Sequence, residues 1–253
     1  MNLAKDVIKK FEDGRIKYYR MNKNSGSSVA RNYGFNKSNG MFIVFLDDDN
    51  EFLPNFLKET AYLLRTSVAE VGGVRVGRII VQKDYKDYAS PITHTGFDSI
   101  DWGFLMKRKV MQNIKYDINI FGDEDADFGI EFAKQYQQIP IDKALQIAYA
   151  NDEDSVCKPT PKRLQGLEYF LNKHLEHYKK HPNELRYIYR LAGRNFYKAG
   201  YKLKGLKYFW KSFLAKPNFK TFKHLFFILF GWNIYDKFMT RYEKIAAKKN
   251  YVK

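Results

Sequence analysis

Cysteine is nearly absent from this chain of 253 residues, which contains only Cys157. One cysteine excludes an internal disulfide framework and a structural zinc site, and it fits a reducing compartment. Long apolar runs are lacking too, because the longest, Leu225–Phe230, falls far short of the roughly 20 residues that span a bilayer. The first twelve residues contain no apolar core of a signal peptide. We therefore expect a cytoplasmic protein, soluble or peripheral at the inner face of the membrane.

Acidic residues are scarce in the second part of the chain. Residues 158–253 carry 23 Lys and Arg against 5 Asp and Glu, a balance of +18. Residues 1–157 carry 21 against 23, a balance of −2. This asymmetry predicts two regions with different functions, divided between residues 157 and 158.

The first region alternates helical and strand-like segments, which is typical of an α/β domain with a mainly parallel sheet. Met41–Leu46 is an unbroken apolar run, and such a run predicts a strand buried on both faces. The other expected segments are a helix at Asn2–Phe11, a strand at Arg15–Met21, a serine-capped helix to Ser38, a helix from Pro54 to Thr66, strands at Val71–Gln82, Asp101–Lys107 and Ala144–Tyr149, a loop at Lys83–Ser99, and a helix from Phe128 to Gln138.

Three consecutive carboxylates, Asp47–Asp49, follow the apolar run directly. They can form a solvated acidic turn that begins the next helix. Alternatively, they can hold a hard divalent cation, Mg²⁺ or Mn²⁺, together with a substrate diphosphate, since such ions prefer oxygen ligands. Their position favours the cation, because ligands of α/β sheets bind beyond the carboxyl ends of the strands.

Several short motifs follow one another along the first region. They are Asn24-x-Gly26-x-Ser28-x-Ala30-Arg31-Asn32-x-Gly34, then Gly40-x-x-Ile43-x-Phe45-Leu46-Asp47-Asp48-Asp49 with its D-x-D pattern, then Pro54-x-x-Leu57, then Trp102-Gly103-Phe104-Leu105, and then Glu124-Asp125-Ala126-Asp127-Phe128. In this order they resemble the donor-site half of family 2 glycosyltransferases. The resemblance covers residues 1–157 and implies a GT-A-type, Rossmann-like fold for a nucleotide-diphospho-sugar transferase.

The resemblance also implies roles for individual residues. Asp49 would be the main metal ligand, supported by Asp47, while Asp48 would lie toward the donor ribose. Arg31 would contact the nucleotide or its diphosphate, as a guanidinium fork suits such oxygens; a surface salt bridge is the alternative. Asp125 would be the general base of an inverting transfer.

The remaining residues of the second acidic cluster would lie on the acceptor side. These are Glu124 and Asp127, together with Trp102 on the preceding strand, and Asp127 would orient neighbours or the acceptor. The alternative for the whole cluster is a set of helix N-terminal carboxylates favoured by the helix dipole.

Two features depart from the family pattern. The strands that normally open the domain are missing, so we expect a domain that is incomplete at its N-terminus, with activity of the chain left open. Many relatives also place a metal- or diphosphate-binding His where this chain has Tyr149–Ser155, and Asn151 or Asp152 is a candidate substitute.

The basic region, residues 158–253, interleaves cations with aromatic residues and predicts helices at Leu164–Tyr178, Asn183–Ala199 and Leu203–Ala215. The spacing in Leu191–Pro217 is typical of a tetratricopeptide-type helical hairpin. Three interpretations stay open: attraction to anionic lipid with Phe222–Trp232 in the interface, a solvated basic surface over an aromatic core, and nucleic-acid binding, which is the least favoured.

The sequence thus predicts a metal-dependent inverting glycosyltransferase of polysaccharide biosynthesis. The donor would be a nucleoside-diphosphate sugar, with UDP preferred, and the acceptor a glycan or a lipid-linked glycan. The alternatives are an inactive truncated remnant, or a basic helical protein that binds membranes or nucleic acid.

Overall fold

The structure is a computed structural model that describes residues 3–82, 85–90, 103–149 and 159–239. In chain order the elements are α1 (Leu3–Ile8), the 3-10 helix η1 (Lys9–Phe11), α2 (Ser27–Lys37), β1 (Phe42–Ile43), β2 (Asn50–Phe52), α3 (Phe56–Thr66), β3 (Val71–Gln82), β4 (Tyr85–Ala89), β5 (Phe104–Lys107), α4 (Arg108–Asn113), α5 (Glu124–Ala133), β6 (Gln137–Tyr149), α6 (Pro161–Lys173), α7 (Leu175–Lys179), α8 (Pro182–Lys198), α9 (Lys202–Ala215) and α10 (Phe219–Leu229). Residues 232–239 are also helical.

The sheet is mixed, and the expectation of a mainly parallel sheet is wrong. Its strand order is β1-β5-β3-β6-β2, with β4 paired to β3 outside this path. Among the strands that the structure describes, β3 and β6 run parallel and the other four pairings are antiparallel. Strand β4 follows β3 after two residues, and so short a link permits only an antiparallel neighbour. The same strand replaces part of the loop expected at Lys83–Ser99.

The apolar run Met41–Leu46 forms an edge strand, not the doubly buried strand that its composition predicts. Only two of its residues pair, and they pair with β5. Among them Ile43 is buried, whereas Met41 and Leu46 at the ends of the run are exposed. A groove lined by Arg15, Lys17 and Tyr19 and by residues of α2 runs along β1.

Several expected helices are confirmed, with shifted ends. Helices α1, α2 and α3 lie where the sequence predicts them, although α2 begins after Gly26 with no serine side-chain cap. Helix α5 begins at Glu124 and ends at Ala133, so its acidic residues lie within the first turn instead of before it. The expected strand at Arg15–Met21 does not form.

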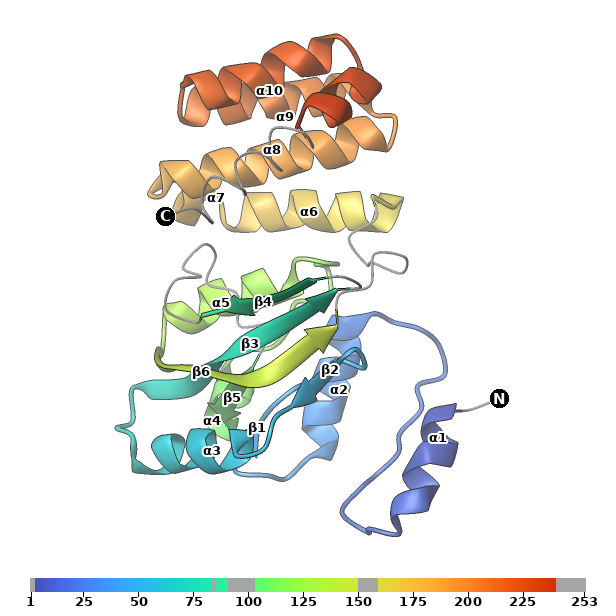
Figure 1. Cartoon of the computed structure of the whole chain (residues 1–253), viewed down its shortest axis with the longest axis vertical. Helices are drawn as coiled ribbons and strands as arrows, with labels where there is room; N and C mark the ends of the chain where they lie inside the picture. Colours follow the sequence, from blue (N-terminus) through green and yellow to red (C-terminus); the bar gives the residue numbers. More distant parts are fainter. Residues whose placement is uncertain (1–2, 83–84, 91–102, 150–158, 240–253) are drawn as a thin grey trace.

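Helices α6 to α10 form a stack that extends away from the sheet (Figure 1). Helix α5 lies between the sheet and α6, then α8 follows, and α9 and α10 form the outer end. Helices α8 and α9 pack against each other, and Gly193 and Gly205 allow their close approach: a Cβ on Gly205 would meet the Gly193 carbonyl oxygen at 3.0 Å. The tetratricopeptide-type character of this pair stays a prediction. Within the part of the chain that the structure describes, no helix is both long and apolar enough to cross a bilayer.

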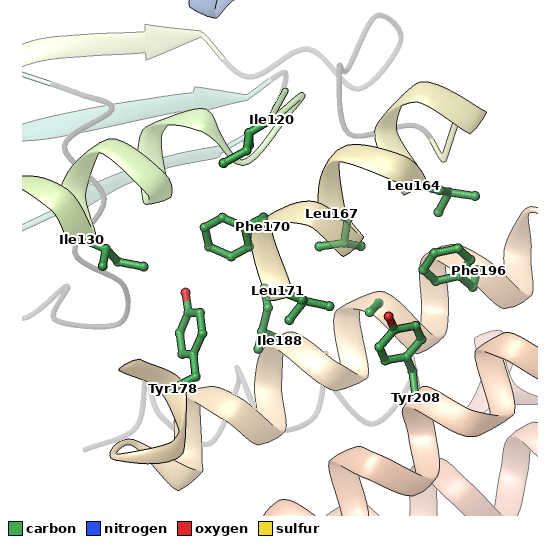
Figure 2. Packing of buried hydrophobic residues seen from close by; sticks show 11 residues of the cluster. Ile120, Ile130, Leu164, Leu167, Phe170, Leu171, Tyr178, Ile188, Phe196 and Tyr208 are labelled. Atoms are coloured by element: carbon green, nitrogen blue, oxygen red, sulfur yellow. The ribbon is translucent and has the colours of Figure 1, made fainter. Parts of the chain in front are cut away.

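A buried apolar cluster joins the helical stack to the first region (Figure 2). Ile120 and Ile130 belong to the segment around α5, and they pack with residues of α6, α7 and α8. The buried members of the cluster are Ile120, Ile130, Leu164, Leu167, Phe170, Leu171, Tyr178, Ile188, Ala192, Phe196 and Tyr208. The division between residues 157 and 158 falls outside the described residues and stays a prediction.

Candidate active site

The Asp triplet lies on an exposed turn between β1 and β2. The backbone amide of Asn50 donates to the Asp47 carbonyl at 3.1 Å and closes this turn. The Asp49 carbonyl accepts from the Tyr149 amide at 2.9 Å, which fixes the turn against the end of β6. All three aspartates are exposed. Solvent can therefore reach all three carboxylates.

Arg31 on α2 connects this turn to α5. Its Nη1 lies 2.8 Å from Asp125 Oδ1, and its Nη2 lies 3.2 Å from Asp47 Oδ1. Glu124 Oε1 lies 3.7 Å from the same Nη1. The Arg31 side chain is only 13% exposed, so these are short-range interactions in a largely desolvated place. One guanidinium thus joins the expected donor-side carboxylate to the expected base.

The groups around Arg31 stabilise the charged form of its guanidinium. Burial alone would lower the pKa of Arg31, but the nearby Asp125, Tyr116, Asp47 and Glu124 outweigh it and raise that pKa above its usual range. The guanidinium carbon also lies 5.2 Å from the centre of the Tyr116 ring, which is within the range of a cation–π contact. A small pocket between these groups is lined by Arg31, Phe45, Asp47, Phe104, Met106, Tyr116 and Asp125.

The first turn of α5 separates two neighbouring acids by direction. Glu124 is buried, and its carboxylate accepts from the Ser27 hydroxyl at the start of α2 and from the Gly122 amide. Asp125 is a quarter exposed and faces Arg31. Glu124 therefore fixes α5 to α2, whereas Asp125 is the acid that solvent can reach.

Arg163 of helix α6 binds the loop that leads into the first turn of α5. This residue is only 3% exposed, and its guanidinium binds both carboxylate oxygens of Asp123 and donates to the Phe121 carbonyl at 2.9 Å. Gly122 has a φ of +84°, and a Cβ there would lie 2.6 Å from Arg163 Nε. The loop before α5 is thus wrapped closely around Arg163.

A second polar cluster links α5 to the end of α6. Asp127 is fully buried, and its Oδ1 lies 2.6 Å from His174 Nε2 and 2.7 Å from Lys173 Nζ. Lys173 also reaches Asp117 at 2.9 Å. Asp127 therefore faces the helical stack, a position that suits orientation of neighbouring elements.

One group of three potential metal ligands occurs among the described residues, and it is not the triplet. It consists of Asp127, Glu131 and His174, whose candidate ligand atoms lie within 4.8 Å of one another. The ammonium group of Lys173 already contacts Asp127 there, so the cluster has its own cation. Asp47 likewise has a cation beside it in Arg31, whereas Asp49 is exposed and offers only oxygen, the ligand atom that a hard divalent ion prefers.

The structure brings together Arg31, Asp47, Asp125 and Glu124 of the expected site residues. Asp48 and Asp49 share the turn with Asp47, while Trp102 and residues 151–152 lie outside the described residues. Sequence reasoning missed Tyr116 and Arg163. The spacing of Tyr116 carries no signal, and Arg163 is hidden in the sequence by the many other cations of the basic region.

Residues 2–122 match the family model described as Glycosyl transferase family 2. The chain is 26% identical over 170 residues to a Campylobacter jejuni GalNAc(5)-diNAcBac-PP-undecaprenol beta-1,3-glucosyltransferase, covering 61% of this chain and 51% of that protein. It is 29% identical over 180 residues to the Staphylococcus aureus poly(ribitol-phosphate) beta-N-acetylglucosaminyltransferase TarP, covering 65% and 54%. The chain thus spans about half the length of these curated relatives.

Two solved structures share the fold at 13% identity. A crystal structure of S. aureus TarS matches 86% of this chain and 80% of its own with a TM-score of 0.52. The mannosyltransferase PcManGT of Pyrobaculum calidifontis, solved with GDP-Man and Mn²⁺, matches 98% and 74% with a TM-score of 0.50. Such similarity confirms a GT-A-like α/β fold.

Proposed function

Because residues 2–122 belong to glycosyl transferase family 2, we propose that this chain transfers a sugar from a nucleoside-diphosphate sugar to a glycan or lipid-linked acceptor. The observation that supports this most is the bridge made by Arg31. A single buried guanidinium contacts Asp47 of the acidic turn and Asp125 of α5, at 3.2 and 2.8 Å. The donor side and the candidate base are therefore held at a fixed separation.

In this proposal Asp125 is the general base of an inverting transfer. The acceptor hydroxyl oxygen attacks the anomeric carbon, and its proton passes to the Asp125 carboxylate. The bond between the anomeric carbon and the diphosphate oxygen breaks, and its electron pair leaves with the nucleoside diphosphate. Arg31 orients Asp125 and adds positive charge beside the leaving diphosphate.

Asp49 and Asp47 would hold Mg²⁺ or Mn²⁺, and Asp48 would lie toward the donor ribose. These aspartates are exposed and offer only oxygen atoms as ligands, which fits such an ion. When bound, the ion supplies neutralisation of the charge on the diphosphate. Glu124 and Asp127 are both buried, so their part in this proposal is to position α5 beside the acceptor.

The acceptor and the place of reaction extend the proposal. The Campylobacter relative is named for an undecaprenol-linked glycan and the staphylococcal relative for poly(ribitol-phosphate). We propose a comparable bacterial surface-glycan or lipid-linked acceptor at the inner face of the membrane, and UDP as the first donor nucleotide to test. The competing possibility is a chain that keeps the fold without turnover.

The deciding experiment measures release of nucleoside diphosphate from a panel of UDP- and GDP-sugars with Mn²⁺. Asp125→Asn should lower turnover by about a hundredfold or more while leaving binding of the nucleotide intact, because a general base contributes about 10²–10⁴-fold. In the wild type, nucleotide with Mn²⁺ should raise the melting temperature, because a ligand at a concentration of a hundred times its Kd stabilises the fold by about 2.7 kcal/mol. Asp49→Ala should abolish this Mn²⁺-dependent rise.

Glu176→Gln is the matched control, because this carboxylate is 81% exposed on α7. It should change neither quantity. Turnover that survives Asp125→Asn would remove Asp125 from the proposed role. Nucleotide binding without turnover of any sugar in the wild-type chain would favour the inactive form.

A further inference from the structure

Helix α10 presents a continuous apolar stripe to solvent. The stripe consists of Phe219, Phe222, Phe226, Leu229 and Phe230, which are 72%, 47%, 43%, 66% and 57% exposed. Phe219, Phe222, Phe226 and Leu229 lie on α10, and at 3.6 residues per turn they fall within an arc of about 80° on one side of the helix; Phe230 follows the last helical residue. Neighbouring rings touch along the stripe, with centroids 6.0 Å apart for Phe222 and Phe226 and 5.0 Å apart for Phe226 and Phe230. The exposed residues therefore form one surface.

The opposite side of α10 is anchored in the protein. Ile228 is fully buried, and it packs in one cluster with Phe209 of α9 and with Tyr235 and Met239 of the following helix. The inward side of α10 thus packs against the protein, and the stripe on its other side faces solvent. Helix α10 lies at the outer end of the stack, on the side away from the sheet (Figure 1).

The chain carries charge of one sign over a long stretch that includes α10. Residues 185–235 contain 11 Lys and Arg and no Asp or Glu. Three of these cations, Arg186, Arg190 and Arg194, recur every four residues on α8. Their field reaches the inward side of α10, where His224 contacts Arg190 and Tyr235: burial, together with the charges of Arg190, Arg194, Arg186 and Lys223, lowers the pKa of His224 to about 3.

We propose that the α10 stripe, with Lys223 at its edge and the other cations of residues 185–235, docks this chain onto an anionic lipid bilayer. Large apolar side chains along one side of a helix enter the interface between headgroups and acyl chains, and nearby cations bind the lipid phosphates. Helix α10 has 11 residues, which suits a position in the plane of the interface. Lys223 fits this arrangement, because its ammonium lies 4.8 Å from the Phe219 ring at the edge of the stripe.

An anionic bilayer explains both features at once. A nucleic acid would use the cations, but it would leave five large apolar side chains facing its phosphates. A second copy of this chain would cover the apolar stripe, but it would bring the same cations together. This docking surface does not depend on the proposed transferase activity, since it contains no residue of the candidate site.

The test is co-sedimentation of the full chain with vesicles of phosphatidylcholine alone or mixed with phosphatidylglycerol. Binding should require the anionic lipid and should weaken strongly at 1 M salt, where the Debye length falls to about 3 Å. The double variant Phe222→Ser/Phe226→Ser should bind about tenfold more weakly or worse, because two half-exposed rings lose their apolar burial.

Phe11→Ser is the matched control, since Phe11 is 62% exposed in η1 and lies outside the stack. It should bind like the wild type. As a second variant that leaves the rings in place, Lys223→Gln should reduce binding to anionic vesicles, because it removes the cation beside the Phe219 ring.

Three results would overturn the proposal. One is equal binding of the Phe222→Ser/Phe226→Ser and wild-type chains to anionic vesicles. Another is salt-sensitive binding of RNA in the absence of any vesicle binding. The third is a dimer in light scattering that the double variant abolishes, again without vesicle binding, since a second copy would then occupy the stripe.

Discussion

Replacement of Arg163 by Met tests whether α6 holds the active-site turn of α5. Met keeps most of the apolar stem and removes the charge, so it leaves the Asp123 carboxylate, which is 11% exposed, without its guanidinium. Loss of one partner from a buried ion pair costs about 3–5 kcal/mol. For a chain of this size 1 kcal/mol shifts the melting temperature by about 2–4 °C, so we expect a fall of roughly 6–20 °C.

The chain offers a matched control in Lys204→Met. Lys204 pairs with Glu168 at 2.7 Å, but their side chains are 44% and 32% exposed. An exposed pair contributes about 0–1 kcal/mol, so this variant should melt within a few degrees of the wild type. Both variants are compared by thermal unfolding followed by circular dichroism.

The double variant Arg163→Met/Asp123→Asn separates charge from packing. If the cost arises from an unpaired buried carboxylate, removal of that carboxylate should recover a large part of the lost stability. Two outcomes would refute the reasoning. One is an Arg163→Met chain that melts like Lys204→Met, and the other is a double variant whose loss equals the sum of the single losses.

Two further predictions concern glycines that pack against Arg163 and Phe121, and a third concerns the titration of His224. Gly122→Ala should destabilise the fold by about 1–3 kcal/mol in urea unfolding, because φ is +84° and the new Cβ would lie 2.6 Å from Arg163 Nε. Gly166→Ala should also destabilise, since its Cβ would meet the backbone nitrogen of Phe121 at 2.7 Å, whereas Gly14→Ala, with open space around it, should not. His224 has a folded pKa lowered to about 3, so its contribution to stability is complete above pH 6.5. That contribution should fall by about 1.4 kcal/mol per unit below pH 6.5, until the pH reaches the folded pKa. His224→Gln should flatten this part of the curve of unfolding free energy against pH, and an unchanged slope would contradict the assignment.

The helices were the most predictable part of the fold, and the strand partners the least. Helices α2 and α3 follow local signals, such as the turn at Gly26 and the proline at 54, that act within a few residues. No local signal decides how deeply the apolar run Met41–Leu46 is buried. Its burial depends on which strands lie beside it, and β5, its partner, comes more than 60 residues later. A run of apolar residues predicts burial, but only the pairing decides how much occurs.

For the candidate site, the motifs located the acids but not their directions. The sequence places Glu124 and Asp125 next to each other with equal charge. The structure turns the first inward to Ser27 and the second outward to Arg31, because adjacent positions on a helix point about 100° apart. Arg31 itself could be proposed as a ligand contact from the resemblance. Its bridge to both acidic clusters needed the tertiary packing of α2 against α5.

Some cations of the basic region bind acids of the first region, and composition alone does not show which ones. Arg163 and Lys173 lie on α6 and bind the acids of the segment from Asp117 to Asp127. Cations of the basic region therefore neutralise some acids of the near-neutral first region, and α6 helps to hold the segment that carries Asp125 in place. From Arg186 onward the cations have no acids of their own segment to bind, up to Asp236. That stretch is where a net charge of +16 can act on an outside partner, and it coincides with the only helix in the described part of the stack whose exposed side is a row of phenylalanines.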